Sequence, residues 1–215
     1  MGWTMPNGDE VFTLAAMEAA FDISRVSLGG PVFDTEKLDW LNGKYLRESG
    51  SDADFQARLL AWAQNSGRLE PIIPLLRQRV EKLSDVAPLI SYFFSGPVSI
   101  TPESFSHCKL APVDACRALQ FALWKLEALG TWNRDEVESA LMKLAEVLDI
   151  KARDFLAPLF VAISGQPVSL SVIDSIAVIG LDLSRARLRI AIETLGGISK
   201  KQAKNLEKEF AQLGQ

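Results

Sequence analysis

Apolar residues recur at the spacing of an α-helix along almost the whole chain, and this pattern most constrains its fold. Within residues 115–130, for example, Leu119, Leu123 and Leu126 fall on one helical stripe. No alternating run of six or more residues indicates a strand, and the Asn42-Gly43 pair lies inside a helical pattern instead of between two strands. The sequence therefore predicts an all-α fold.

Capping residues indicate where several of these helices begin and end. Each predicted start has a Ser or Asn, followed three residues later by Asp, Glu or Gln, which is the pattern of an N-terminal cap. A Gly pair at 196–197 suits a left-handed C-terminal cap. The predicted starts lie at Ser51, Asn133, Ser171 and Ser199.

Proline and glycine punctuation divides the helical pattern. The sequence PIIP at 71–74 separates a first block from a second, and a short charged join near 149–154 separates the second from a third. We therefore predict three consecutive helical units, residues 1–72, 73–148 and 149–215.

Composition favours a folded protein outside the membrane. Hydrophobic residues make up 48% of the 215 residues, and no apolar run approaches the roughly 20 residues that a transmembrane helix needs. The opening MGWTMPNGDE is acidic and broken by Pro6 and Gly8, unlike a signal peptide. We expect a soluble, cytoplasmic protein with no membrane partner.

Signals for catalysis or metal binding are weak. The chain has no glycine-rich loop of the kind that cradles phosphate, and it has one histidine, His107. With Cys108 and Cys116, His107 supplies only three potential metal ligands, clustered in a short segment, which make a poor tetrahedral set. We predict no catalytic residue and no metal site, and interpret the cysteines as inert thiols.

Cations line up beside an apolar stripe in the segment VSLGGPVFDTEKLDWLNGKYLRE (26–48). The net charge is −4, but residues 151–215 carry 9 basic and 6 acidic side chains. A local basic face can bind nucleic acid on an acidic protein, because salt screens distant charges; ordinary solvated helix faces are the alternative. On the helical wheel, Lys37, Lys44 and Arg47, with Trp40 among them, lie next to the stripe of Leu38, Leu41 and Tyr45.

This segment closely resembles a signature of bacterial glutamyl-tRNA synthetases, which are class I aminoacyl-tRNA synthetases. Three further segments resemble the same family in the same order and at about the same spacing. They are GWTMPNGDEVFTL, LLRQRVEKLSDVAPLISYFF (75–94) and AISGQPVSLSVIDSIAVIGLDLSRARLRIAIE (162–193). The resemblance covers essentially the whole chain.

The resemblance also identifies motifs that this chain lacks. The family's catalytic half binds ATP and Mg²⁺ and carries a His-Ile-Gly-His-type motif and a Lys-Met-Ser-Lys-type loop; neither occurs here. The chain is therefore similar to the C-terminal, tRNA-binding half. We expect no cofactor in it, glutamate tRNA as its partner, and a catalytic domain in cis.

The first unit resembles the family's stem-contact region. This implies that Lys37, Lys44 and Arg47, and Ser27 in the SLGG turn, contact tRNA phosphates or 2′-hydroxyls, which fix register without reading bases. Trp40 and Leu41 are expected in the core.

The later units resemble the family's helical anticodon-binding cage. Arg79 aligns with an arginine that reads the third anticodon base in members that discriminate glutamate from glutamine tRNA. The loop SGQPVSLSV then places Ser169, Leu170 and Val172 at the first two anticodon bases, with Phe160 as a stacking or core residue. On the helix that follows, Arg185, Arg187 and Arg189 are expected at the surface as candidate contacts to the RNA backbone.

Two other interpretations stay open. The chain could be a helical protein-interaction module without a nucleic-acid partner, or the same half of a non-discriminating paralogue that charges both glutamate and glutamine tRNAs. Salt-dependent binding separates the first from a tRNA-binding domain, and Arg79 argues against the second.

Overall fold

The fold is all-α, as the helical periodicity predicted. The computed structural model describes residues 2–27, 29–30, 34–48, 50–63, 66–167 and 169–213, except for the side chains of residues 66 and 68, and these ranges contain helices and no strand. The chain divides into two compact units, unit 1 (Met1–Gln64) and unit 2 (Asn65–Gln215). None of the described helices has the length and apolar character needed to cross a membrane.

Unit 1 has little interior. Its helices are α1 (Leu14–Ala20), α2 (Thr35–Glu48) and α3 (Asp52–Ala63), with a 3₁₀ turn at Ile23–Arg25. None of these helices contains a buried residue, and Met5 is the sole buried hydrophobic residue among the described parts of the unit.

The predicted core face of α2 is therefore corrected. Leu38 and Tyr45 are 50% and 46% exposed, and Trp40, also expected in the core, is 47% exposed. Leu41 is half-buried. The physical reason is the lack of a packed layer against α2 in the described part of unit 1, so the amphipathic stripe has nothing to bury it. Gly43 does not break α2, although a Cβ there would lie 2.9 Å from Arg47 Nη1.

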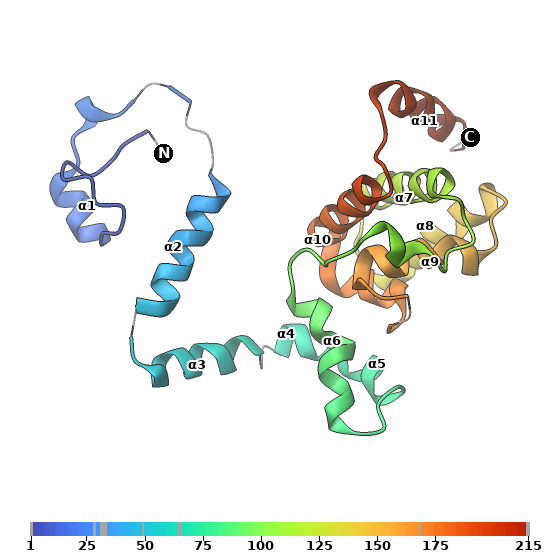
Figure 1. The fold of residues 1–215 in the computed structure, drawn as a ribbon, viewed down its shortest axis with the longest axis horizontal. Helices are drawn as coiled ribbons and strands as arrows, with labels where there is room; N and C mark the ends of the chain where they lie inside the picture. Colours follow the sequence, from blue (N-terminus) through green and yellow to red (C-terminus); the bar gives the residue numbers. More distant parts are fainter. Residues whose placement is uncertain are drawn as a thin grey trace. The chain divides into compact units, whose positions relative to one another are not determined.

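Unit 2 contains a continuous hydrophobic core. Helices α7, α8, α9 and α10 pack against one another and α6 packs on α10 (Figure 1). Leu119, Val137, Phe155 and Leu188, one from each of the four packed helices, are 0% exposed. The helices are α4 (Ser66–Leu69), α5 (Ile73–Arg77), α6 (Val86–Phe94), α7 (Pro112–Glu127), α8 (Arg134–Val147), α9 (Ala152–Ser164), α10 (Val172–Thr194) and α11 (Lys200–Leu213), with 3₁₀ turns at Leu83–Asp85 and Pro102–Phe105.

This core crosses the join at residues 148–149, where the sequence predicted a boundary between two subdomains. Leu141 of α8 and Phe155 of α9 belong to the same buried cluster. The structure thus groups 73–148 and 149–215 in one unit, and its division at residues 64–65 lies before the PIIP segment.

The predicted caps are confirmed. The Asp54 carboxylate accepts from the Ser51 backbone N–H at 2.8 Å, and Asn133 Oδ1 accepts from the Glu136 N–H at 2.9 Å. Ser199 and Gln202 form the reciprocal capping pair before α11. Gly197, with φ of 72°, donates its N–H to the Ile192 carbonyl at 2.9 Å, which closes the end of α10.

A kink divides α10 at Gly180. Its φ of 83° and ψ of 170° lie outside the helical region, in a part of backbone space that is essentially restricted to glycine. The helix axis therefore changes direction at Gly180, between the N-terminal part of α10 and the part that carries Arg185, Arg187 and Arg189.

Candidate nucleic-acid interface

Arg79 lies at the surface, two residues beyond the end of α5. Its backbone N–H donates to the Leu76 carbonyl at 2.8 Å, and both Leu76 and Val80 pack in the core on either side of it. Its side chain is exposed and makes no ion pair with any described residue. The backbone is thus anchored while the guanidinium is available to an external acceptor, as a base-reading role requires.

The loop at 164–171 presents different residues from those predicted. Ser169, Leu170 and Val172 are 4%, 1% and 2% exposed. Their side chains lie in the core, because the loop turns inward to begin α10, so they cannot meet a base directly in this conformation. Among the described residues of the loop, Pro167 is exposed, and Gly165, Gln166 and Ser171 are half-buried.

Phe160, the other predicted base-contact residue, is half-buried. It packs against the hydrophobic core of unit 2. Of the two roles that the sequence left open for it, stacking on a base and core packing, the structure shows packing.

Arg187 also differs from its prediction as a surface residue. It is 0% exposed and donates hydrogen bonds to backbone carbonyls, with no carboxylate among its hydrogen-bond partners in the described chain. Burial lowers its pKa to about 10, so the side chain is still cationic at neutral pH. Arg187 is therefore unavailable to RNA.

Arg185 and Arg189 stay near the surface but share one carboxylate. Arg185 Nε lies 2.9 Å and Arg189 Nη2 3.4 Å from Glu127 Oε1. Arg189 has the more exposed side chain, at 60% against 34%. Arg189 is consequently the better placed of the two for a phosphate contact.

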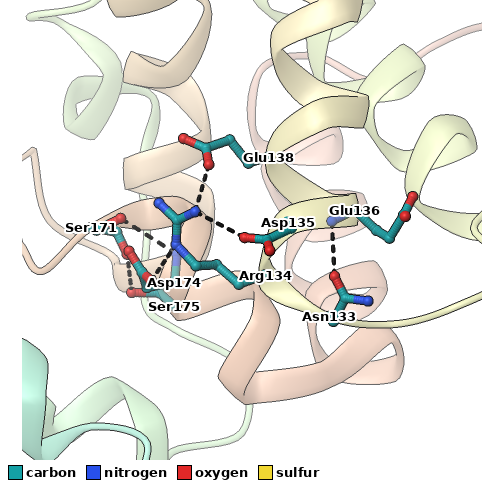
Figure 2. A network of polar contacts seen from close by, with 8 residues as sticks. All are labelled: Asn133, Arg134, Asp135, Glu136, Glu138, Ser171, Asp174 and Ser175. Atoms are coloured by element: carbon teal, nitrogen blue, oxygen red, sulfur yellow. Dashed lines mark hydrogen bonds and ion pairs between the residues drawn. The ribbon is translucent and has the colours of Figure 1, made fainter.

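A polar network ties the start of α8 to the start of α10 (Figure 2). Arg134 Nε contacts Asp174 Oδ1 at 3.0 Å, and its Nη1 bonds Glu138 at 2.5 Å and Asp135 at 3.3 Å. The hydrogen bond with Glu138, followed by that with Asp135, raises the pKa of Arg134. The Arg134 guanidinium is thus paired with protein carboxylates. Its contact with Asp174 holds the start of α10, which follows the 164–171 loop.

The cations predicted in unit 1 are exposed or half-buried. Lys37 pairs with Glu10. Lys44 lies 3.9 Å from Glu48 and 5.5 Å from the centre of the Trp40 ring. Arg47 is exposed with no ion pair to a described residue.

Ser27, the remaining candidate of unit 1, is exposed in its turn. Its hydroxyl accepts from the Gly29 N–H at 3.3 Å, and its own backbone N–H donates to the Gly2 carbonyl at 2.6 Å. The hydroxyl therefore stabilises the turn itself and keeps one face toward solvent.

One cationic surface was missed from the sequence. Helix α11 packs through Phe210 on Phe121 and Trp124 of α7. Its other face carries exposed lysines without an ion pair to a described residue. The i, i+4 spacing of Lys200, Lys204 and Lys208 is the signal that would have identified it. The exposed lysines are Lys200, Lys201, Lys204 and Lys208.

The histidine and cysteines do not assemble with other ligands. Cys108 Sγ lies 3.9 Å from His107 Nε2, whereas Cys116 is buried beside the Ile192 carbonyl. Burial raises the pKa of both thiols, which disfavours the thiolate that a metal needs. Within the described residues, no group of three His, Cys, Asp or Glu side chains could hold a metal ion.

An exposed arginine beside a helical core thus stands as the best candidate for reading RNA, and comparison with known proteins supplies its context. The profile of the family described as the anticodon binding domain matches residues 54–192, well over half of the chain. This chain belongs to the anticodon-binding domain family. The match includes Arg79 and the 164–171 loop.

Known relatives match this chain over nearly all of its length. The chain is 52% identical over 213 residues to the glutamate–tRNA ligase of Marinomonas sp., and the match covers 99% of this chain and 43% of the relative. It is 51% identical over 215 residues to the glutamate–tRNA ligase of Saccharophagus degradans, again spanning 43% of that protein. The domain thus spans less than half the length of these relatives.

A solved structure shares the fold of the anticodon-binding domain. It is the crystal structure of a glutamate tRNA ligase from Elizabethkingia meningosepticum in complex with its amino acid. The two match with a TM-score of 0.54 and 22% identity over 90% of this chain and 39% of that one. At this identity the match supports the all-α arrangement alone.

Proposed function

We propose that this chain binds glutamate tRNA and reads its anticodon for a glutamate–tRNA ligase. The observation that carries the proposal is the family match over residues 54–192. It is supported by sequence identity to glutamate–tRNA ligases over nearly the whole of this chain. Arg79, which is exposed and has no ion pair with a described residue, supplies a chemical group suited to the task.

The chemistry of Arg79 favours cytosine over guanine. A guanidinium has hydrogen-bond donors and no acceptor. Cytosine offers the acceptors O2 and N3 on its pairing edge, whereas guanine offers the donors N1–H and N2–H there. Because glutamate anticodons end in C and glutamine anticodons end in G, Arg79 would accept the first and reject the second. A bidentate contact of this kind contributes about 1–3 kcal/mol of discrimination.

The remaining cations would hold the RNA without reading it. Ser27, Lys37, Lys44 and Arg47 of unit 1 are candidates for contacts to the tRNA stem, and Arg189 and the α11 lysines for contacts to phosphates. Docking would place the acceptor end in a catalytic domain outside this chain, where ATP and Mg²⁺ drive glutamylation. The proposed setting is the cytoplasm.

The test is a titration of the 215-residue chain with two tRNA transcripts at two salt concentrations. One transcript carries the glutamate anticodon, and the other differs only by G in place of C at the third anticodon base. We expect tighter binding of the first transcript. The affinity for both should fall steeply with salt, since each phosphate contact contributes roughly −0.7 to −0.9 to the slope of the logarithm of the binding constant against the logarithm of the salt concentration.

Either part of this result can fail separately. An absence of salt-dependent binding would contradict the proposal and favour a protein-interaction module. Salt-dependent binding with equal affinity for the two transcripts would indicate a non-discriminating tRNA-binding domain and remove the assigned role of Arg79.

A further inference from the structure

A buried polar network joins three segments of unit 2 that are distant in sequence. Arg187 of α10 donates to the carbonyls of Ser95 and Gly96, each at 2.8 Å from Nη2, and to that of Tyr92 at 2.5 Å. Its Nη1 donates to the Ile163 carbonyl at the end of α9. One side chain therefore fixes the end of α6 and the end of α9 on α10.

The position of these acceptors explains how the core tolerates an arginine. The last carbonyls of a helix lack partners within the helix and carry the negative end of its dipole. Tyr92 and Ser95 lie at the C-terminal end of α6, and Ile163 lies in the last turn of α9. Two helix ends thus offset the buried charge of Arg187 in place of a carboxylate.

A second branch of the network has a defined direction. Ser175 Oγ donates to the Ser171 carbonyl at 2.7 Å, so its single hydrogen is used. The Tyr92 hydroxyl, 2.7 Å from Ser175 Oγ, must then be the donor in that contact. Burial raises the pKa of Tyr92, which keeps this donor protonated at neutral pH. The branch runs from α6 through Ser175 to the residue that begins α10.

The network ends on both sides of the 164–171 loop. Arg187 holds the end of α9 just before the loop, and the Tyr92 branch holds Ser171 where the loop finishes. On the outer side, the Asp174 backbone N–H donates to the Ser171 hydroxyl at 3.4 Å, and the Asp174 carboxylate pairs with Arg134 (Figure 2). The two elements assigned to anticodon reading are thereby connected, since Leu76 and Val80, on either side of Arg79, pack in the same hydrophobic cluster as Tyr92 of α6.

We propose that Arg187, Tyr92 and Ser175 are positioning residues for anticodon recognition, which set the 164–171 loop at a fixed distance from the segment that carries Arg79. This inference rests on the proposed function. It assigns Ser169, Leu170 and Val172 the role of anchoring the loop from inside, while Gln166 and Pro167 face the RNA. Recognition of the third base and recognition of the first two would then depend on one another.

The test removes single hydroxyls, because loss of Arg187 would leave several carbonyls unpaired and could prevent folding. Tyr92→Phe and Ser175→Ala both delete the hydrogen bond between these two side chains. Ser175→Ala also deletes the bond from Ser175 Oγ to the Ser171 carbonyl, and Tyr92→Phe also deletes the contact of the Tyr92 hydroxyl with Ser169. Ser184→Ala is the matched control, since Ser184 is also a buried hydroxyl of α10 but has no hydrogen-bond partner among the described residues. Each variant of the full 215-residue chain is titrated with the glutamate transcript and with the transcript carrying G at the third anticodon base.

We expect Tyr92→Phe and Ser175→Ala each to weaken binding of the glutamate transcript by roughly threefold to tenfold, the equivalent of one hydrogen bond. Binding of the altered transcript should change little, so the ratio of the two affinities narrows. The double variant should lose less than the sum of the two single effects, because both single variants remove the Tyr92–Ser175 hydrogen bond. Ser184→Ala should leave the ratio unchanged.

An unchanged ratio in Tyr92→Phe and Ser175→Ala would overturn the inference, as would equal weakening of both transcripts, which is the result of a purely structural role. These outcomes are distinct from failure of the proposed function. That failure appears in the unmodified chain, as an absence of preference for the glutamate transcript.

Discussion

At the scale of single residues, arginines in this domain serve opposite purposes. Arg79 is held by its backbone, and its guanidinium has no partner among the described residues, whereas Arg187 uses its donors on carbonyls inside the protein. Arg134 is satisfied by carboxylates on the surface. The state of the guanidinium, and not its presence in the sequence, decides which of them can meet RNA.

Replacing Arg79 should change specificity and leave the fold intact. Arg79→Gln supplies a carbonyl that can accept from guanine, so the preference for the glutamate transcript should fall by about fivefold or more, in line with the loss of a bidentate contact. Competition between the two transcripts measures this. Arg77→Gln, an exposed neighbour in the last turn of α5, should weaken both transcripts alike; if the two variants behave identically, Arg79 does not read the base.

The start of α3 should show a pH dependence that originates at one carboxylate. Hydrogen bonds from the Ser51 backbone N–H, and then from its hydroxyl, lower the pKa of Asp54 from the ordinary value of 3.8. Because the folded-state pKa is the lower one, ionised Asp54 stabilises the helix start above about pH 4, and this stabilisation is lost as pH falls through the folded-state pKa.

An NMR titration of the Asp54 carboxyl checks this. In Ser51→Ala the hydroxyl bond is gone, so the pKa of Asp54 should move upward. The pKa of Asp22, which is lowered by Ser24, should not move. No difference in Asp54 between the two proteins would contradict the hydroxyl contribution.

At the scale of helices, the sequence predicted interactions between residues close in the chain but not those between residues far apart in it. The caps at Ser51, Asn133 and Ser199 involve partners three residues away, so the sequence contains both halves of each interaction. The partners of Arg187 lie as far as 95 residues away. No partner of Arg187 is close enough in sequence to separate it from Arg185 and Arg189.

A weaker signal for Arg187 was nevertheless present. Its position falls on the same helical stripe as Ser184, Leu188 and Ala191, all of which are buried. The stripe predicts an inward arginine, but only the fold shows what would satisfy it. In the same way, the spacing placed Ser169, Leu170 and Val172 in the correct loop, while their inward direction depends on how α10 begins.

The kink in α10 should require glycine. Gly180→Ala places a Cβ on a backbone with φ of 83°, although no neighbouring atom lies within 4 Å of it. We expect the free energy of unfolding to fall by about 1–3 kcal/mol from backbone strain alone. Chemical denaturation measures the change. Gly130→Ala, where the space is equally open and φ is not positive, is the control and should have a much smaller effect.

At the scale of the whole molecule, the two units differ in how much each buries. Helices α1, α2 and α3 contain no buried residue, whereas α7 alone buries Leu119, Phe121 and six others. Since local stability follows buried apolar contact, unit 1 should open more readily than unit 2.

Hydrogen exchange measures this directly. Amide protons of α7 and of the C-terminal part of α10 should exchange at least about tenfold more slowly than those of α2 and α3, a difference of about 1.4 kcal/mol in opening free energy. Binding of tRNA should slow exchange in unit 1 if it contacts the stem. Equal exchange in the free chain would show that unit 1 has a stabilising interior of its own.

The carbonyl acceptors of Arg187 also decide where this polypeptide can be cut. A peptide of residues 149–215 would keep the guanidinium and the Ile163 carbonyl but lose those of Tyr92, Ser95 and Gly96. The complementary N-terminal piece would keep the carbonyls at the end of α6 but lose the guanidinium that donates to them. Each part alone would leave buried polar groups without hydrogen-bond partners. Unit 2 should therefore fold only when residues 65–215 are expressed together.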